Sequence, residues 1–324
     1  MSDHFYRLAS YAQGNDAPRA GIIVDDWMID VSGALQQAGD AALAAAGISV
    51  LGVLRRWSDM HPKLQAIARA ARNGGKPATA APLSAAQLLA PVLYPGTVFC
   101  AGANYRDHVE EMTKALNLPA EPDPHELGLK PWHFIKPSKP CVRGIGARIP
   151  LPAYSQRVDW EAEIAVVIGR ECRNVGVAEA PGYVAGVSIV NDLSARDHIR
   201  RAGVAAGSPF QFDWVSHKSF DGALPFGPWV VPIDQIPDIG NLAIRLWVNE
   251  ELMQDSSSTN MIFTAAEQIA HLSSRLTLQP GDVIATGTPA GCGAARGRFL
   301  QPGDRVSIWV EGIGVLVNEF TTEG

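Results

Sequence analysis

The sequence predicts an α+β protein that is rich in strands, with a small N-terminal α+β domain at residues 1–95 and a larger domain at residues 96–324. Residues 34–47 and 62–73 are rich in Ala and Leu at helical spacing and contain few strand formers. From residue 96 onward, short apolar runs typical of strands predominate. A Gly- and Pro-rich connector at residues 74–82 separates the two regions, because these residues break both helices and strands.

The individual elements follow from local patterns. Residues 20–31 predict a hairpin, because two apolar runs flank an Asp-Asp turn. Helices are predicted at residues 105–116 and 262–275. Prolines interrupt residues 117–131, which predicts a long loop that is either functional or a plain surface excursion. Strands are predicted at residues 97–101, 161–169, 183–191, 243–249, 282–286, 305–310 and 313–318.

Composition excludes several classes of protein. The 27 Lys and Arg residues are outnumbered by 33 Asp and Glu residues, for a net charge of −6 without a long basic run, so we expect no nucleic-acid partner and no anionic membrane partner. No apolar window is long enough to span a membrane, and the first residues lack the pattern of a secretory signal. We therefore expect a cytoplasmic protein whose cysteines are free thiols, at positions 100, 141, 172 and 292.

Two glutamates precede a strongly apolar run. Side chains alternate along a strand, so Glu161 and Glu163 should project from one face of the strand that continues through residues 164–168. Two adjacent carboxylates at the start of a buried strand repel each other and lose solvation, which favours shifted pKa values or a bound cation. The alternative is an edge strand with both glutamates in water or paired with Arg157 and Arg170.

A third carboxylate follows the next apolar strand. Asp192 stands directly after residues 183–191, where it could complete a three-carboxylate site. Taken alone, Asp192 would more often cap a helix that begins near Ser194. Together with Glu161 and Glu163, however, it favours a divalent cation, because hard oxygen ligands suit Mg²⁺, Mn²⁺ or Ca²⁺.

Three further segments offer catalytic groups. His108 and Glu111 are three residues apart on a predicted helix, where the carboxylate could orient the imidazole as a general base or where both could simply face solvent. Lys218 stands close to an aromatic residue and an acid, although it could be a surface lysine. Residues 287–291 form a Gly-rich turn after a strand, whose hydroxyl and N–H groups could hold a carboxylate or enolate oxygen or could be a plain turn.

Six segments in order resemble the fumarylacetoacetate hydrolase family, over roughly residues 96–320. Each segment alone is a weak signal, but their shared order is specific. The matching segments are Asn104 to Glu111, Asp159 to Glu163, Asn191 to Asp197, Lys218 to Asp221, Val248 to Phe263, and Thr286 to Gly291.

The resemblance implies a catalytic domain built as a mixed β-sheet roll, which forms a homodimer and holds Mg²⁺ or a similar ion. By resemblance, Glu161, Glu163 and Asp192 would be the metal ligands.

The same resemblance implies roles for the other groups. His108, paired with Glu111, would activate water or move a proton, and Lys218 would neutralise oxyanion charge near the metal. Tyr105 and Thr288 would contact the substrate. In many relatives the segment after His108 is a mobile lid, which fits the proline-interrupted loop.

The implied activity is hydrolysis of a C–C bond in an acylpyruvate- or fumarylacetoacetate-like 2-oxo acid of aromatic or amino-acid catabolism. The alternative is an isomerase or decarboxylase of an unsaturated oxo-dicarboxylate of the hydroxymuconate or oxaloacetate type. A catalytically silent metal-binding protein is disfavoured, because it would not need His108, Glu111 and Lys218. One departure concerns the substrate: hydrolytic relatives often have x-Gln where this chain has His198 and Ile199.

Overall fold

The computed structural model describes residues 5–120 and 122–323. Residues 1–4, on which the expectation of no secretory signal rests, lie outside this range. The strands are β1 Arg7–Ala12, β2 Arg19–Val24, β3 Trp27–Asp30, β4 Ala80–Pro82, β5 Gln87–Leu88, β6 Val98–Ala101, β7 His133–Lys136, β8 Val142–Arg143, β9 Arg148–Leu151, β10 Val158–Asp159, β11 Ala162–Ile168, β12 Val184–Asn191, β13 Ser194–Ala195, β14 Leu224–Pro232, β15 Ala243–Val248, β16 Glu251–Ser257, β17 Val283–Ala285, β18 Arg305–Val310 and β19 Gly314–Thr322. The α-helices are α1 Val31–Gln37, α2 Ala41–Ala46, α3 Val50–Arg55, α4 Trp57–Arg72, α5 Arg106–Ala115, α6 Ser138–Cys141, α7 Trp214–Lys218, α8 Ala265–Arg275 and α9 Gly293–Arg296.

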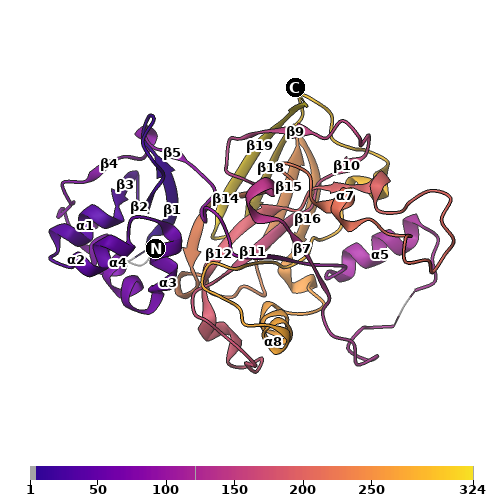
Figure 1. The fold of residues 1–324 in the computed structure, drawn as a ribbon, viewed down its shortest axis with the longest axis horizontal. Coiled ribbons are helices and arrows are strands. Elements are labelled where there is room, and N and C mark those ends of the chain that lie inside the picture. The colour runs from indigo at the N-terminus through magenta and orange to yellow at the C-terminus, as the bar shows by residue number, and fades with distance from the viewer. Residues whose placement is uncertain (1–4, 121, 324) are drawn as a thin grey trace.

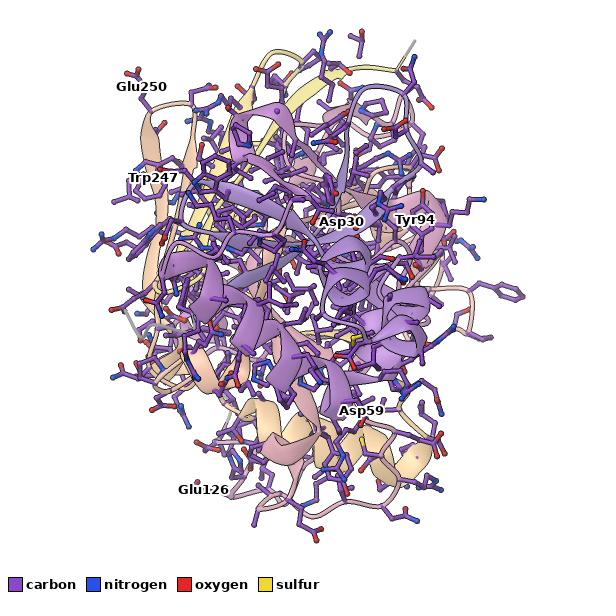
Figure 2. The ribbon with its side chains drawn as sticks, turned by 90° about the vertical axis from the view of Figure 1, so that its left-hand side faces the viewer. Asp30, Asp59, Tyr94, Glu126, Trp247 and Glu250 are labelled. Carbon is purple, nitrogen blue, oxygen red and sulfur yellow. The ribbon has the colours of Figure 1, made fainter. Side chains whose placement is uncertain are left out.

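The N-terminal elements form a lobe beside the larger part of the chain (Figure 1). The predicted hairpin is present, because β2 and β3 pair antiparallel across Asp25 and Asp26. Helices α1, α3 and α4 contact β2. Asp30, labelled in Figure 2, accepts a hydrogen bond from the backbone N–H of Gly33. It also forms an ion pair with Arg19, whose Nε lies 2.6 Å from Asp30 Oδ2. Asp30 therefore caps α1 while it ties that helix to the hairpin.

The strands of both regions form one continuous large sheet in the described chain. Its order is β4-β3-β2-β1-β14-β12-β11-β17-β6-β7, and the N-terminal lobe joins it where Leu8 of β1 pairs with Val230 of β14. A second sheet has the order β16-β15-β18-β19-β9, and its strands contact β11, β12 and β14 of the first. Parallel pairs such as β17–β6 and β19–β9 occur among antiparallel ones. The predicted strand-rich fold with a mixed sheet is confirmed.

Two central strands position the candidate site. Every residue of β11 and β12 is buried, as their continuous apolar runs predict. They pair antiparallel with Ala162 opposite Asn191, so the start of β11 lies beside the end of β12. The backbone N–H of Asp192 donates to the carbonyl of Glu161 at 2.9 Å, which places the third carboxylate next to the first two.

The structure contains strands that the sequence did not predict, among them β1, β7, β9 and β16. Two further differences involve proline-containing segments. The end of the expected connector at residues 74–82 is β4, which pairs with β3. Strand β14 was not expected, because it contains Pro225, Pro228 and Pro232. Among the described residues, no helix combines the length and apolar character that crossing a membrane requires.

Candidate active site

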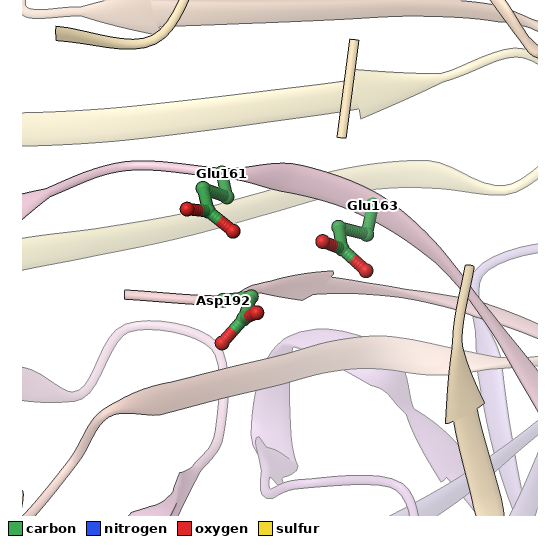
Figure 3. A group of neighbouring side chains, drawn as sticks. All are labelled: Glu161, Glu163 and Asp192. Carbon is green, nitrogen blue, oxygen red and sulfur yellow. The ribbon is translucent and has the colours of Figure 1, made fainter. Parts of the chain in front are cut away.

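Three buried carboxylates converge between the start of β11 and the end of β12 (Figure 3). Glu161, Glu163 and Asp192 each offer an oxygen, and these oxygens lie within 4.8 Å of one another. At most 6% of each residue is exposed. The structure thus brings together the three residues that the sequence analysis proposed as metal ligands.

Two lysines bond to Asp192. Lys218 Nζ lies 2.7 Å from Asp192 Oδ2 and 2.8 Å from Glu161 Oε2, so it bridges two of the three carboxylates. Lys136 Nζ lies 2.5 Å from Asp192 Oδ1 and also donates to the carbonyls of Leu193 and Ala223, at 2.9 and 2.6 Å. Both lysines are almost completely buried.

Arg196 supplies a third cation. Its Nη2 lies 2.6 Å from Glu161 Oε1, and its Nε lies 2.9 Å from Asp159 Oδ2. Ser194 Oγ also donates to Glu161 Oε1 at 2.8 Å. The crowded carboxylates are therefore compensated in part by side-chain cations, which the electrostatic argument from sequence did not anticipate.

The two glutamates have opposite pKa shifts. Burial raises the pKa of Glu163 well above its ordinary value, and the neighbouring charges of Asp192 and Glu161 raise it further. Burial acts in the same direction on Glu161, but the charges of Lys218 and Arg196 outweigh it and lower that pKa. Glu163 is the carboxylate with the least side-chain compensation, since the hydrogen bond that it accepts at Oε2 comes from the backbone N–H of Gly287 at 2.8 Å.

The donor set fits a hard divalent cation. It consists of three carboxylates whose oxygens already lie close together, and Glu163 is short of positive charge. Oxygen ligands of this kind suit Mg²⁺, Mn²⁺ or Ca²⁺.

A pocket of about 180 Å³ opens onto Glu161 and Glu163. One part of its lining is polar or charged, and another part is aromatic. The lining residues are Ala101, Gly102, Ala103, His108, Trp132, Phe134, Glu161, Glu163, Arg196, Ile199, Trp214, His217, Lys218 and Thr288.

His108 lines the pocket, whereas Glu111 points to the Gly-rich turn. Burial lowers the pKa of His108 to about 4, so its imidazole is neutral at pH 7. The Nδ1 atom of His108 is buried and has no hydrogen-bond partner in the part of the chain that the structure describes. Glu111 Oε2 accepts a hydrogen bond from the backbone N–H of Gly291 at 2.8 Å. The expected pairing of His108 with Glu111 is thus not a hydrogen bond here.

The two residues expected to contact substrate differ in position. Thr288 lines the pocket, and its hydroxyl accepts a hydrogen bond from Gln254 Nε2 at 2.9 Å, which leaves the hydroxyl proton for a ligand. Tyr105 is completely buried and is not part of the pocket lining.

The Gly-rich turn serves the protein's own carboxylates. The N–H groups of Gly287 and Gly291 bond to Glu163 and Glu111 rather than facing the pocket. Both glycines have φ near +100°. A Cβ atom on Gly291 would lie 2.0 Å from the carbonyl oxygen of Met253. The turn therefore requires glycine at this position.

Sequence reasoning missed several residues of the site. Arg196 lies inside a segment that carries the family resemblance, but the sequence does not show that it pairs with Asp159 and Glu161. Lys136 ends a short strand without any motif that marks it as buried. Trp132 and Trp214 lie outside every periodic pattern, and only the fold brings them together.

Comparisons with known proteins identify the family of the chain. A family model described as "Fumarylacetoacetate (FAA) hydrolase C-terminal" matches residues 97–321. The human mitochondrial oxaloacetate tautomerase FAHD2B is 37% identical over 240 residues, which cover 74% of this chain and 70% of that protein.

Solved structures match almost the whole chain. A maleylpyruvate hydrolase from Sphingobium sp. SYK-6, in complex with manganese(II) ion and pyruvate, has a TM-score of 0.71 and 26% identity and covers 98% of this chain and 100% of its own. A 2-hydroxyhepta-2,4-diene-1,7-dioate isomerase from Mycobacterium marinum has a TM-score of 0.67 and 28% identity, covering 98% and 99% of the two chains. The chain, from the ordered motifs to the whole fold, belongs to the fumarylacetoacetate hydrolase family.

Proposed function

We propose that the protein is a divalent-metal-dependent hydrolase that cleaves a C–C bond in an acylpyruvate-like 2-oxo acid. The observation that carries this proposal is the placement of His108. Its imidazole lines the same pocket as Glu161 and Glu163, and one of its ring nitrogens has no partner among the described residues. A neutral imidazole beside a metal-binding carboxylate cluster is positioned to accept a proton from water.

Glu161, Glu163 and Asp192 would hold the metal. When bound, a divalent cation supplies Lewis acidity toward the carbonyl oxygens of a 2-oxo acid. The similarity to a maleylpyruvate hydrolase in complex with manganese(II) and pyruvate supports this assignment. We propose Mg²⁺ as the physiological ion, with Mn²⁺ or Ca²⁺ as substitutes.

The chain's own residues supply the remaining functions. Thr288 donates its hydroxyl proton to the substrate carboxylate, and His108 accepts a proton from the attacking water. The water oxygen bonds to the distal carbonyl carbon, and the C–C bond to the pyruvate methylene breaks. The electron pair of that bond forms the enolate of pyruvate, which takes a proton to give pyruvate beside a carboxylic acid. Lys218 stabilises the developing oxyanion charge.

A second candidate function is tautomerisation, isomerisation or decarboxylation of an oxo-dicarboxylate. The similarity to an oxaloacetate tautomerase over 74% of the chain favours it. His108 could move a proton at the carbon next to the carbonyl without any attack by water. Both reactions pass through an enol or enolate, so they would use the same pocket.

Paired rates separate the two functions. In His108→Ala, we expect hydrolysis of an acylpyruvate to fall by roughly 10²- to 10⁴-fold, the usual contribution of a general base. Decarboxylation of oxaloacetate needs mainly the Lewis acid, so it should fall much less. Glu111→Gln should have a milder effect, because a glutamine oxygen can still accept the bond from Gly291.

Binding of Mg²⁺ to His108→Ala, measured by calorimetry, is the control for an intact site, since His108 is not a proposed ligand. Wild-type hydrolysis in this variant would show that the general-base role is wrong. Tautomerisation of oxaloacetate by the wild type, without hydrolysis of any acylpyruvate, would favour the second function.

Other features of the protein also stay proposals. The four cysteines are all buried and free, which supports a reducing compartment such as the cytoplasm. Family membership supports a homodimer, which sedimentation velocity would test. A place in aromatic or amino-acid catabolism follows from the proposed substrate class.

A further inference from the structure

The pocket lining includes the large apolar side chains of Trp132, Phe134, Trp214 and Ile199, here called the apolar wall. The ring of Trp214 stacks on Phe134 at 5.4 Å and meets Trp132 edge-on at 5.6 Å. Trp132 is 48% exposed and Trp214 is 38% exposed. A ligand arm that leaves the carboxylate cluster toward solvent would cover these rings.

The backbone of Gly102 supports the apolar wall. A Cβ atom at this position would lie 1.9 Å from the Trp132 ring, so the indole rests directly on the glycine backbone. The N–H of Gly102 also donates to the carbonyl of Trp132 at 3.2 Å. The position of the Trp132 ring thus depends on the absence of a side chain at residue 102.

The cationic side chains that line the pocket are already paired with carboxylates of the site. Among the described lining residues, the lysine and arginine side chains are Lys218 and Arg196, and both already bond to carboxylates of the site. Ile199 adds an apolar side chain to the lining. A carboxylate placed against these rings would give up part of its hydration. The cation nearest to Phe134, Lys218 Nζ at 4.8 Å from the ring centroid, is already paired with Glu161 and Asp192.

We propose that the apolar wall selects 2-oxo acids whose distal arm is uncharged and planar and that it disfavours arms ending in a second carboxylate. This inference rests on the proposed function, because it assumes that the 2-oxo acid head lies at Glu161, Glu163 and Thr288. The small pocket volume indicates a compact substrate, since sites for drug-sized ligands span roughly 300–1,000 Å³.

The test compares two ligands that differ only at the end of the arm. Both 2-oxo-4-phenylbutanoate and 2-oxoglutarate carry the same 2-oxo acid head and the same two-carbon linker. Neither has the second keto group that C–C hydrolysis requires. Their Kd values are measured by calorimetry in the presence of Mg²⁺. We expect the phenyl compound to bind at least roughly tenfold more tightly, since its ring gains aromatic contacts and avoids desolvating a charge.

Variants test whether the apolar wall causes the preference for the phenyl compound. Trp132→Ala should weaken binding of the phenyl compound by about 2- to 10-fold, as the loss of one aromatic contact predicts. Gly102→Ala should act in the same direction, because it displaces the Trp132 ring without removing it. Ile199→Lys should narrow the preference by strengthening binding of 2-oxoglutarate, on the order of tenfold.

Phe212→Ala is the matched control, because Phe212 is an exposed aromatic residue that lies against Arg200 and does not line the pocket. It should leave both Kd values unchanged. The Kd for Mg²⁺ shows whether each variant has kept its carboxylate cluster.

The outcomes distinguish this inference from the proposed function. Equal affinities, tighter binding of 2-oxoglutarate, or binding of neither compound would overturn the selection by the apolar wall. A preference for the phenyl compound without hydrolysis of any acylpyruvate would leave the selection standing and overturn the hydrolase assignment. Faster hydrolysis of acylpyruvates whose arm ends in a carboxylate would support the hydrolase assignment and overturn the selection by the apolar wall.

Discussion

Glu163 has the most consequential charge of the three carboxylates, because no side-chain cation of the described chain bonds to it. Replacing Glu163 by Gln removes the charge but keeps an oxygen that can accept the hydrogen bond from Gly287. We expect the affinity for Mg²⁺ to fall by at least about tenfold. The metal-free protein should be as stable as the wild type or more stable, since one of three mutually repelling charges is gone.

Calorimetric titration with Mg²⁺ and thermal unfolding in chelator measure these two quantities. Glu319→Gln, at an exposed position of β19, is the control and should change neither. An unchanged affinity for Mg²⁺ in Glu163→Gln would contradict the assignment of this residue as a ligand.

Lys136 is a structural cation. The residue is 1% exposed. Its ammonium group forms an ion pair with Asp192 and donates hydrogen bonds to two backbone carbonyls. Lys136→Met keeps most of the volume but leaves Asp192 with one fewer cation, so we expect a loss of about 3–5 kcal/mol in the free energy of unfolding. Urea denaturation measures the loss.

Lys139→Met is the matched control, because Lys139 is exposed on α6 three residues later. A surface change of this kind should stay within about 0.5 kcal/mol of the wild type. Equal stability of both variants would show that Lys136 contributes no net stabilisation.

At the scale of residues, the sequence predicted which acids meet, and the family resemblance implied Lys218 beside them, but neither predicted Lys136 or Arg196. Glu161, Glu163 and Asp192 could be proposed because strand alternation and an antiparallel neighbour place them together. Lys136 could not be proposed, because it is distant from Asp192 in the sequence and only the tertiary fold brings the two residues together. Whether a lysine is exposed or buried is decided by packing, which no local pattern contains.

Among the elements, the loop between α5 and β7 is held to α8 by one histidine. His125 Nε2 lies 3.0 Å from Glu267 Oε1, and its Nδ1 lies 3.2 Å from Asp123 Oδ1. Arg106 also faces Asp123, at 3.9 Å. In Figure 2, Glu126 of the same loop lies at the periphery of the molecule.

This contact should depend on pH. Hydrogen bonding to Glu267, followed by that to Asp123, raises the pKa of His125 above its ordinary value. The protonated form therefore favours the docked loop, and its stabilisation is complete below the ordinary histidine pKa of about 6.5 and lost as pH rises through the raised value. We expect hydrogen-exchange protection factors of the loop to fall as pH rises above the ordinary histidine pKa and through the raised pKa of His125.

His125→Gln should abolish this pH dependence, because glutamine can bond to both carboxylates but does not titrate in this range. Protection that is independent of pH in the wild type would contradict the role of His125. Addition of oxalate, an enolate mimic, tests the separate expectation that residues 112–131 become ordered when a 2-oxo acid binds.

Strand prediction succeeded for the uninterrupted apolar runs of the interior. It failed for more polar strands such as β1 and β16 and for β14, where proline intervenes. β11 and β12 lie in the interior, so their sequences are almost wholly apolar and are easily identified. β14 carries three prolines, yet it pairs with β12 through a register irregularity between Val187 and Ile189. Partners on either side hold this strand in place, and those partners are distant in sequence.

For the whole molecule, the N-terminal lobe and the larger part share one sheet and one hydrophobic core in the described chain. We therefore expect a single cooperative thermal transition rather than two. Leu8 and Val230 are completely buried where they pair. Leu8→Ala should therefore lower the free energy of unfolding by about 2–5 kcal/mol and shift this single transition to a lower temperature.

Differential scanning calorimetry of the wild type and of Leu8→Ala measures this coupling. A second transition that Leu8→Ala shifts alone would show that the lobes unfold independently. The expected division into residues 1–95 and 96–324 would then describe separate folding units as well as separate sequence patterns.

The Gly-rich turn also has an evolutionary consequence. Gly287 donates a hydrogen bond to the proposed metal ligand Glu163, and Gly291 donates one to Glu111 on the helix that carries His108, so a mutation in this turn would disturb both groups at once. In the described part of the chain, the hydrogen-bond and ion-pair partners of the three carboxylates do not include Trp132 or Ile199. Descendants of this protein could therefore acquire new substrates by drift at the apolar wall, while purifying selection keeps the turn unchanged.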